Sequence, residues 1–206
     1  MERAVIEKLI KSLERNNMKG YFVNDENELI ELIKSLVPEN SIVGGGDSVT
    51  LEDTNVYNFF RNGNYTFYDK YREGITREEK DAIYIKNFSA DTFVSGTNAI
   101  TMDGKLFNID GYGNRLAPIV YGPKQVIIVV GINKIVDNVE EAIKRTRQIA
   151  APLDAVRLKV NTPCIKLKKC IDCNHKERIC NAFVLIAGQF TKDRIKVIII
   201  NKELGY

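Results

Sequence analysis

The stretch that decides the fold is DTFVSGTNAITMDGKLFNIDGYGNR, residues 91–115, in which short apolar runs alternate with four glycines. Residues 93–100 and 105–109 have the composition of strands, and Asp103-Gly104 lies between them. An Asp-Gly pair between alternating apolar runs is a strong local hairpin signal. The stretch therefore predicts a β-hairpin, followed by a polar loop that ends near residue 115.

The polar side chains of this stretch exceed what a hairpin needs. Its glycines allow the backbone to adopt positive φ or to approach a ligand closely. The hydroxyl, amide, carboxylate and guanidinium groups around them are suited to a polyhydroxylated or phosphorylated small molecule. We expect a binding site rather than a solvated loop, and its candidate residues are Thr97, Asn98, Asp110, Asn114 and Arg115, with Asp103 explained by the hairpin turn.

A second glycine-rich segment follows the expected strand at residues 41–43. It places free backbone N–H groups and a hydroxyl at the start of an expected helix, where an anion can bind. A plain strand-to-helix connection is the alternative, because the segment matches neither the dinucleotide-binding nor the P-loop pattern. The residues concerned are Gly44, Gly45, Gly46, Asp47 and Ser48.

Helical and strand patterns alternate along the chain, which predicts an α/β fold with a mostly parallel, Rossmann-like sheet and ligands at the carboxyl ends of its strands. We expect one domain over residues 1–206, with a helical lead-in at 1–38 and a cysteine-rich insert at 162–182. The expected helices are 2–15, 26–36, 76–88 and 138–150, and the expected strands are 20–23, 41–43, 65–68, 126–131 and 194–201, the last at the sheet edge.

The composition and net charge of the chain disfavour nucleic-acid-binding and membrane-spanning proteins. The chain of 206 residues is 44% hydrophobic and 28% charged, which is typical of a globular protein. Its net charge of +3 is too small to favour nucleic acid, and no apolar run is long enough to span a membrane. The first twenty residues lack the features of a secretory signal, so we expect a cytoplasmic protein. The aromatic residues between 57 and 71 indicate core packing or a lid.

All four cysteines of the chain lie within 17 residues, in the pattern C-x5-C-x2-C-x6-C. Without an export signal, such clustering favours a metal site over disulfides. Four thiolates suit zinc or an iron–sulfur cluster equally, so the metal stays open. The alternatives are a metal-free reduced loop or a redox disulfide within the Cys-x-x-Cys pair. The expected ligands are Cys164, Cys170, Cys173 and Cys180, with His175 as a bystander.

Four motifs together resemble the LUD family, the lactate-utilisation domain proteins, in its short single-domain form. They are VSGTNAITMDGKLFNIDGYGNR, YGPKQVIIVVGINKIV, RQIAAPLDAVRL and TPCIKLKKCIDCNHKERIC, and the resemblance extends from about residue 40 to the end. It implies a fold similar to the sugar-phosphate isomerase and coenzyme A transferase superfamily. It also implies a role in bacterial lactate oxidation, in company with iron–sulfur partner proteins.

The leading hypothesis is a cytoplasmic protein of this type that binds a small anionic ligand between two loops and carries a metal. Residues 44–48 would donate N–H groups from one loop. From the other loop, Asp110 would act as acid or base and Arg115 would pair with the ligand. The alternatives are a sugar-phosphate isomerase or transferase, and a redox or metal-binding module built on the four cysteines.

Overall fold

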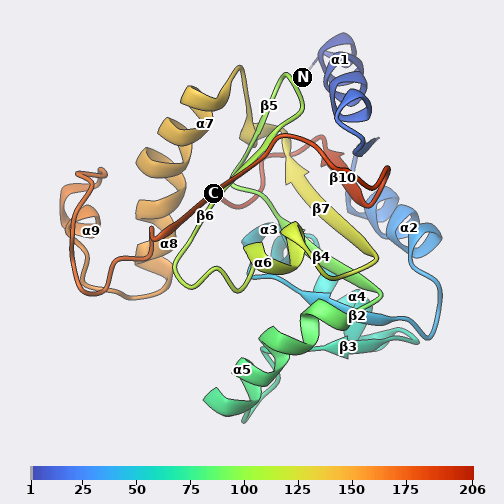
Figure 1. Cartoon of the computed structure of the whole chain (residues 1–206), viewed down its shortest axis with the longest axis horizontal. Coiled ribbons are helices and arrows are strands. Elements are labelled where there is room, and N and C mark those ends of the chain that lie inside the picture. The colour runs from blue at the N-terminus through green and yellow to red at the C-terminus, as the bar shows by residue number, and fades with distance from the viewer. Residues whose placement is uncertain (1) are drawn as a thin grey trace.

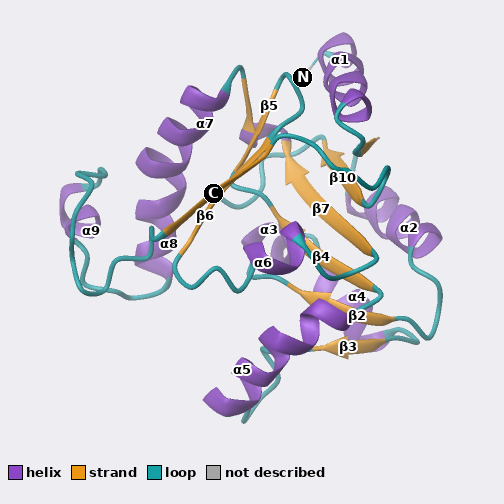
Figure 2. Ribbon diagram, in the orientation of Figure 1, coloured by secondary structure: helices purple, strands orange, loops and turns teal. Residues whose placement is uncertain are grey.

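The computed structural model describes residues 2–206, and its centre is a six-stranded, all-parallel sheet (Figures 1 and 2). The strand order is β1-β10-β7-β4-β2-β3. This is the α/β architecture with a mostly parallel sheet that the alternation of patterns predicts. The strands are β1 (Lys19–Val23), β2 (Ile42–Gly45), β3 (Thr66–Tyr68), β4 (Thr92–Gly96), β7 (Gln125–Gly131) and β10 (Ile195–Ile200).

The last strand does not lie at the sheet edge, and this expectation is wrong. β10 pairs with β1 on one side and with β7 on the other. The physical reason is the composition of β10, IKVIII, in which five of six residues are buried. A strand that is apolar on both faces is stable only where helices or a second sheet cover both faces, as happens inside a parallel sheet.

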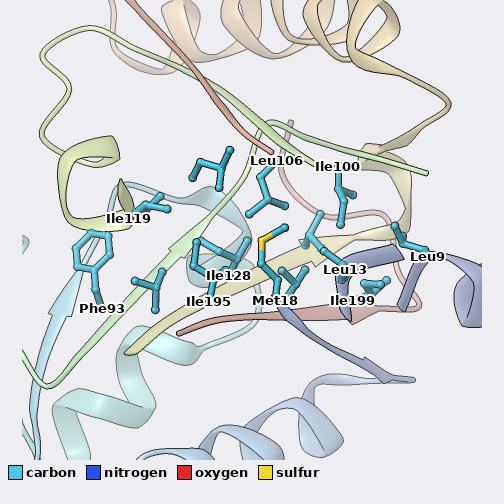
Figure 3. Close-up of a cluster of buried hydrophobic side chains, with 14 of the residues drawn as sticks. Leu9, Leu13, Met18, Phe93, Ile100, Leu106, Ile119, Ile128, Ile195 and Ile199 are labelled. Carbon is cyan, nitrogen blue, oxygen red and sulfur yellow. The ribbon is translucent and has the colours of Figure 1, made fainter. Parts of the chain in front are cut away.

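Two apolar layers cover the central sheet on its two faces. On one face, Ile6, Leu9 and Leu13 of α1 pack with Phe93, Ile128 and Ile199 (Figure 3). On the other, side chains of α2, α3 and α4 pack against Val94, Ile127 and Ile198. The helices are α1 (Arg3–Arg15), α2 (Glu26–Leu36), α3 (Val49–Asp53), α4 (Val56–Asn62), α5 (Arg77–Lys86), α6 (Leu116–Val120), α7 (Val139–Arg145), α8 (Ala151–Arg157) and α9 (Pro163–Leu167).

A second sheet of four strands contains the predicted hairpin turn, but only residues 99–100 of the predicted first arm. Its order is β8-β5-β6-β9, with β5 (Ala99–Thr101) antiparallel to β6 (Leu106–Asp110). The expected arm 93–100 is divided, because β4 belongs to the central sheet and only β5 enters the hairpin. Gly104 adopts φ +80° at the turn. The remaining strands are β8 (Ile135–Val136) and β9 (Ala182–Ile186).

The chain changes sheet at residues 97–98, and side-chain hydrogen bonds hold this change in place. The Asn98 side chain accepts from the backbone N–H of Ile109 at 2.9 Å, and the backbone N–H of Asn98 donates to the Asn108 side chain at 3.1 Å. Thr97 Oγ1 donates to the carbonyl of Ala99 at 3.1 Å. These bonds replace the ladder bonds that a continuous strand would make.

Helix starts follow the local signals. Asp25 caps α2, and Thr76 with Glu79 forms the capping box of α5. The helix expected at 138–150 extends beyond residue 150, because α7 continues through the π-helical turn η3 (Thr146–Ala150) into α8. Pro152 lacks the N–H that would bond one turn back, which accounts for the wide turn at this place.

The cysteine-rich segment follows α8 and contains α9 and an irregular loop before β9, at the left of Figure 1. The short 3-10 turns are η1 (Asn87–Ser89) and η2 (Ile132–Lys134). Across residues 2–206, no helix combines the length and the apolar character that a membrane span requires.

Candidate functional site

A hollow of about 400 Å³ lies where the carboxyl ends of the central strands meet the start of α8. The turn after β2, the last residue of β4 and the segment after β7 all contribute to its wall. The loop that follows β6 and the end of the cysteine-rich segment, at Ile179 and Cys180, complete this wall. This volume is in the range of small-molecule sites, and the position is the one that parallel α/β sheets favour for ligands.

The structure brings most of the sequence-predicted residues to this one hollow. Residues 47–48 from the first expected loop meet residues 97–98 and 110–115 from the second. Ser48 accepts a hydrogen bond from the N–H of Leu51 and so caps α3. The predicted residues that line the hollow are Asp47, Ser48, Thr97, Asn98, Asp110, Asn114 and Arg115.

The three glycines of the first loop have a different place from the one expected. Gly44 and Gly45 are ladder residues of β2, and Gly46 donates its N–H to the carbonyl of Val94 at 2.9 Å. None of the three lines the hollow among the described residues. A Cβ atom on Gly46 would lie 2.5 Å from Ser95 Oγ, so close packing requires the glycine there. The expectation that these glycines donate N–H groups to a ligand is therefore corrected.

Arg115 is buried and fully engaged by the protein. Its Nε and Nη2 bond to Asp110 Oδ1 at 3.0 and 2.7 Å. Nη1 donates to the Asn108 side chain at 2.7 Å and to the carbonyl of Gly96, and Nη2 also donates to the carbonyl of Ile109. A guanidinium has five N–H donors, and all are used here. Arg115 thus fixes the loop around β6 instead of presenting a free cation.

Asp110 is held by the same arginine. Besides the two guanidinium bonds, its Oδ2 accepts the backbone N–H of Arg115 at 3.2 Å. The pair is about a tenth exposed, with side-chain exposures of 8% for Arg115 and 11% for Asp110. Both carboxylate oxygens of Asp110 are thus occupied by Arg115, Oδ1 by the guanidinium and Oδ2 by the backbone N–H, which suits a positioning group better than a general acid or base.

A second ion pair, which the sequence did not reveal, borders the hollow and joins a buried lysine to a partly exposed aspartate. Lys70 Nζ is 3.0 Å from Asp47 Oδ1, and the Tyr71 hydroxyl donates to the same oxygen. Burial alone would raise the pKa of Asp47, but Lys70 and Tyr71 outweigh it and hold that pKa below its ordinary value. Burial lowers the pKa of Lys70, against the attraction of Asp47. Nothing local around residue 70 predicts this contact.

Lys134 is the other buried cation that the sequence reading missed. It ends η2, directly after β7, and is 5% exposed. Its Nζ donates to Thr50 Oγ1 at 2.9 Å. Burial, with help from the charges of Arg145 and Arg115, lowers the pKa of Lys134 to about 7, and Asp53 opposes this shift. A usable signal existed, since a polar residue just after a buried parallel strand points to the ligand edge.

The charge around the hollow is positive. Three carboxylates border it, those of Asp47, Asp110 and Asp154, and each is paired with a bordering basic side chain. Six basic side chains border it in all. Within residues 2–206, Lys80 and Lys134 have no carboxylate at ion-pair distance. The basic side chains are Lys70, Arg77, Lys80, Arg115, Lys134 and Arg157.

The four cysteines are free thiols that border one cavity of about 20 Å³. Burial raises the pKa of the Cys180 thiol to about 11, with a further contribution from the nearby Cys170. In the described part of the chain, no three His, Cys, Asp or Glu side chains are already arranged as metal ligands. Ile179 and Cys180 border both this cavity and the large hollow, so the two features share a wall.

Comparison with known proteins identifies the family. The LUD domain model matches residues 6–200. Among solved structures, a DUF162 family protein from Deinococcus radiodurans is similar, with a TM-score of 0.50 and 12% identity over 97% of this chain and 99% of that one. Ribose 5-phosphate isomerase A from Methanocaldococcus jannaschii has a TM-score of 0.36 and 17% identity, over 56% of each chain.

Among the curated proteins, none matches this chain. The likeness to the Deinococcus protein extends over nearly the whole of both chains and concerns the fold alone, given its low identity. The family match covers both sheets and the segments that form the hollow. On this evidence, the chain belongs to the LUD domain family.

Proposed function

We propose that this protein binds a small hydroxy acid or a related anion in the hollow, and that it serves lactate utilisation. The observation that carries the proposal is the charge of the hollow, where every bordering carboxylate is paired and Lys80 and Lys134 are not. A carboxylate ligand would supply the missing counter-charge, and charge-assisted hydrogen bonds are the strong ones. The hydroxyl of the ligand would find neutral partners in Ser48 and Asn114.

In this proposal the pair Arg115 and Asp110 shapes the site without touching the ligand. Its bonds hold residues 96, 108 and 109 in place around the end of β4. Lys80 of α5 and Lys134 of η2 border the hollow from separate elements, since one precedes β4 in the sequence and the other follows β7. Two cations from separate elements are a suitable clamp for a ligand of a few carbon atoms.

Thermal unfolding with candidate ligands tests the proposal. L-lactate, D-lactate, pyruvate, ribose 5-phosphate and inorganic phosphate are added one at a time, and a ligand at 100 times its Kd stabilises by about 2.7 kcal/mol. We expect a shift with the hydroxy acid or its oxidised partner, and a smaller shift with phosphate.

Paired variants make this experiment specific. Lys80→Met removes an unpaired cation of the hollow and should weaken binding by about tenfold. Lys124→Met is the matched control, because Lys124 is exposed and pairs with Asp91 away from the hollow. A shift that both variants retain in full would place the ligand elsewhere, and no shift with any ligand would contradict the proposal.

A second function is favoured by one observation on the cysteine segment. Four thiols from separate points of the segment face one small cavity, although they lie up to 16 positions apart in the sequence. We propose that they hold a zinc ion or an iron–sulfur cluster, with iron–sulfur proteins as partners in lactate oxidation. The donor set fits, since four thiolates satisfy either group. Arg147 and Arg178 would offset the negative charge, as both lie in the same wall.

Metal analysis and a visible spectrum of protein purified without oxygen separate the two metals. An iron–sulfur cluster absorbs visible light, whereas stoichiometric zinc is colourless. Cys173→Ser should lose the metal, and His175→Asn should keep it because the histidine does not border the cavity. Metal-free protein in all preparations, or equal retention in both variants, would reject this second function.

A further inference from the structure

Lys134 occupies a position that the binding proposal does not fully use. It follows β7, a central strand, at the edge of the sheet where ligands of parallel α/β folds bind. The residue lines the hollow and is almost completely buried. Lys134 is therefore part of the wall of the hollow instead of the solvent-exposed surface, where lysines are usually found.

The surroundings of the amine are unusual for a lysine. Its single hydrogen-bond partner among residues 2–206 is Thr50 Oγ1, an uncharged acceptor. On one side, a Cβ atom at Gly205 would lie only 3.3 Å from Nζ, so the backbone closes that side. The charged groups that act on it are Arg145 of α7, Arg115 before α6 and Asp53 of α3. Two of these three groups are cations, and they disfavour a positive charge on the Lys134 amine.

This environment keeps a large fraction of the amine unprotonated near neutral pH. Burial and the two arginines lower the pKa of Lys134 to about 7, with Asp53 acting in the opposite direction. Desolvation next to other cations is the usual way in which proteins activate a lysine as a nucleophile. The hollow also offers a second, unpaired cation in Lys80, which can hold an anionic group of the same ligand.

We propose that Lys134 forms an imine with a small carbonyl compound that carries an anionic group, a 2-oxo acid being the simplest member of this class. The inference rests on the proposed function, because it places its ligand in the same hollow. It also adds to that function, since a 2-oxo acid is the oxidised form of a 2-hydroxy acid.

The chemistry balances without any redox partner. The lone pair of Nζ attacks the carbonyl carbon, and the carbonyl π electrons move to oxygen, which takes up a proton. The resulting carbinolamine loses its hydroxyl group, with a proton, as water. The C–O bond is then broken, a C=N bond to Lys134 is formed, and one water molecule is released. Thr50 is a positioning residue that holds Nζ at the hollow.

Reductive trapping tests the proposal on the whole chain. The protein is incubated with pyruvate and sodium cyanoborohydride, which reduces the imine to a stable secondary amine, and the product is measured by intact mass and peptide mapping. The expected adduct adds one pyruvic acid less one oxygen atom, at Lys134. At pH 7 its initial rate should exceed that of exposed lysines by on the order of a hundredfold, because those stay protonated.

Variants and a second probe keep the outcome decisive. Lys134→Met and Lys134→Arg should both lose the adduct, because neither side chain carries a nucleophilic amine. Lys124→Met, at an exposed position outside the hollow, should keep it. Pyridoxal 5′-phosphate, an aldehyde with an anionic group, should label the same residue first. Labelling spread over many lysines, or retained in the Lys134 variants, would overturn the proposal.

The two proposals fail in different ways. A pyruvate-dependent thermal shift without an adduct rejects the imine and leaves binding in the hollow intact. An adduct of pyridoxal 5′-phosphate at Lys134, with no shift from lactate or pyruvate, supports the reactive amine and rejects the hydroxy-acid function.

Discussion

Arg115 and Lys134 are two buried cations on the wall of the same hollow, and their surroundings are opposite. Arg115 has a carboxylate partner and acceptors for every N–H group. Lys134 has one neutral acceptor, and neighbouring arginines repel its charge. A buried charge that is fully bonded stabilises one arrangement of the chain, whereas an incompletely bonded one is available to a ligand.

The two residues therefore have different roles in one site, since Arg115 holds the fold and Lys134 is the candidate for chemistry. Residues 108–115 attract attention in the sequence as ligand groups, yet Arg115, Asp110 and Asn108 mainly bond to one another. The segment around Lys134 has no glycine-rich loop, and its one signal is a polar residue just after a buried parallel strand, yet it contains the reactive candidate. Variants of both residues can strengthen this comparison or break it.

The largest effect is expected for Arg115→Ala. The change leaves Asp110 as a buried charge without its partner and removes the bonds to two carbonyl groups, so stability should fall by about 3–5 kcal/mol. Urea unfolding measures the loss. The exposed pair of Lys124 and Asp91 is the control, where Lys124→Ala should change stability by less than about 1 kcal/mol. Similar values for both variants would show that Arg115 is not the structural centre of the loop.

Lys134→Met should act in the opposite direction at neutral pH. Because the pKa of Lys134 is about 7 when folded and 10.5 ordinarily, the unfolded chain binds more protons between these values, and stability rises with pH across that window. The buried charge lowers the stability of the folded chain by its full amount below about pH 7 and does not lower it above about pH 10.5. The methionine variant should therefore be more stable by roughly 2–5 kcal/mol at pH 6 and equal near pH 10.

Chemical denaturation at several pH values follows this difference. Lys80→Met is a suitable comparison, since Lys80 is only half-buried on the rim of the hollow. A pH-independent difference between the Lys134 variant and the parent would contradict the assignment of a buried, easily deprotonated amine.

Gly46→Ala probes the packing behind Arg115. An added Cβ atom would lie 2.5 Å from Ser95 Oγ and 2.9 Å from the Cγ atom of Arg115, so we expect a loss of about 1–3 kcal/mol from forced displacement. Gly111→Ala is the matched control, because its nearest neighbour would be 3.6 Å away. Thermal unfolding of the two variants measures the loss of stability in each. If both alanines are tolerated equally, close packing is not the reason for glycine at position 46.

The smallest effect is expected for Thr50→Val, which removes the only acceptor that the Lys134 amine has among residues 2–206 while keeping the shape of the side chain. The charged form should lose about 1 kcal/mol at pH 6, with no change near pH 10, where the amine is neutral. Thr54→Val, at a threonine whose hydroxyl donates to the Thr50 carbonyl, controls for loss of a helix hydroxyl. A pH-independent loss at position 50 would remove its proposed link to Lys134.

The comparison also explains which predictions from the sequence were confirmed. The parallel α/β architecture, the helix that starts at Thr76 and the turn at Gly104 all follow from residues within a few positions of one another. Residues 110–115 follow β6 of the second sheet, so their approach to the hollow depends on how that sheet packs. The meeting of residues 47–48 with residues 97–98 was predictable, because both segments follow strands of one parallel sheet. The place of β10 was not, since the order of strands depends on what covers each face.

The roles of individual site residues were harder to predict from the sequence. The glycines at positions 44–46 read as ligand donors, whereas their need for small size comes from Ser95, Arg115 and Asn87, which are distant in the sequence. Lys70 and Lys134 were missed for the same reason, because Asp47 and Thr50 approach them only after folding.

The sequence by itself determined the elements of this protein, the family to which it belongs and the edge of the sheet where polar loops gather. These depend on backbone preferences and apolar periodicity, which act over a few residues. Only the tertiary structure decided which buried cation is bonded on all sides and which is not. A pKa or an unpaired charge depends on distances of a few ångströms between segments far apart in the chain, and no local pattern encodes those distances.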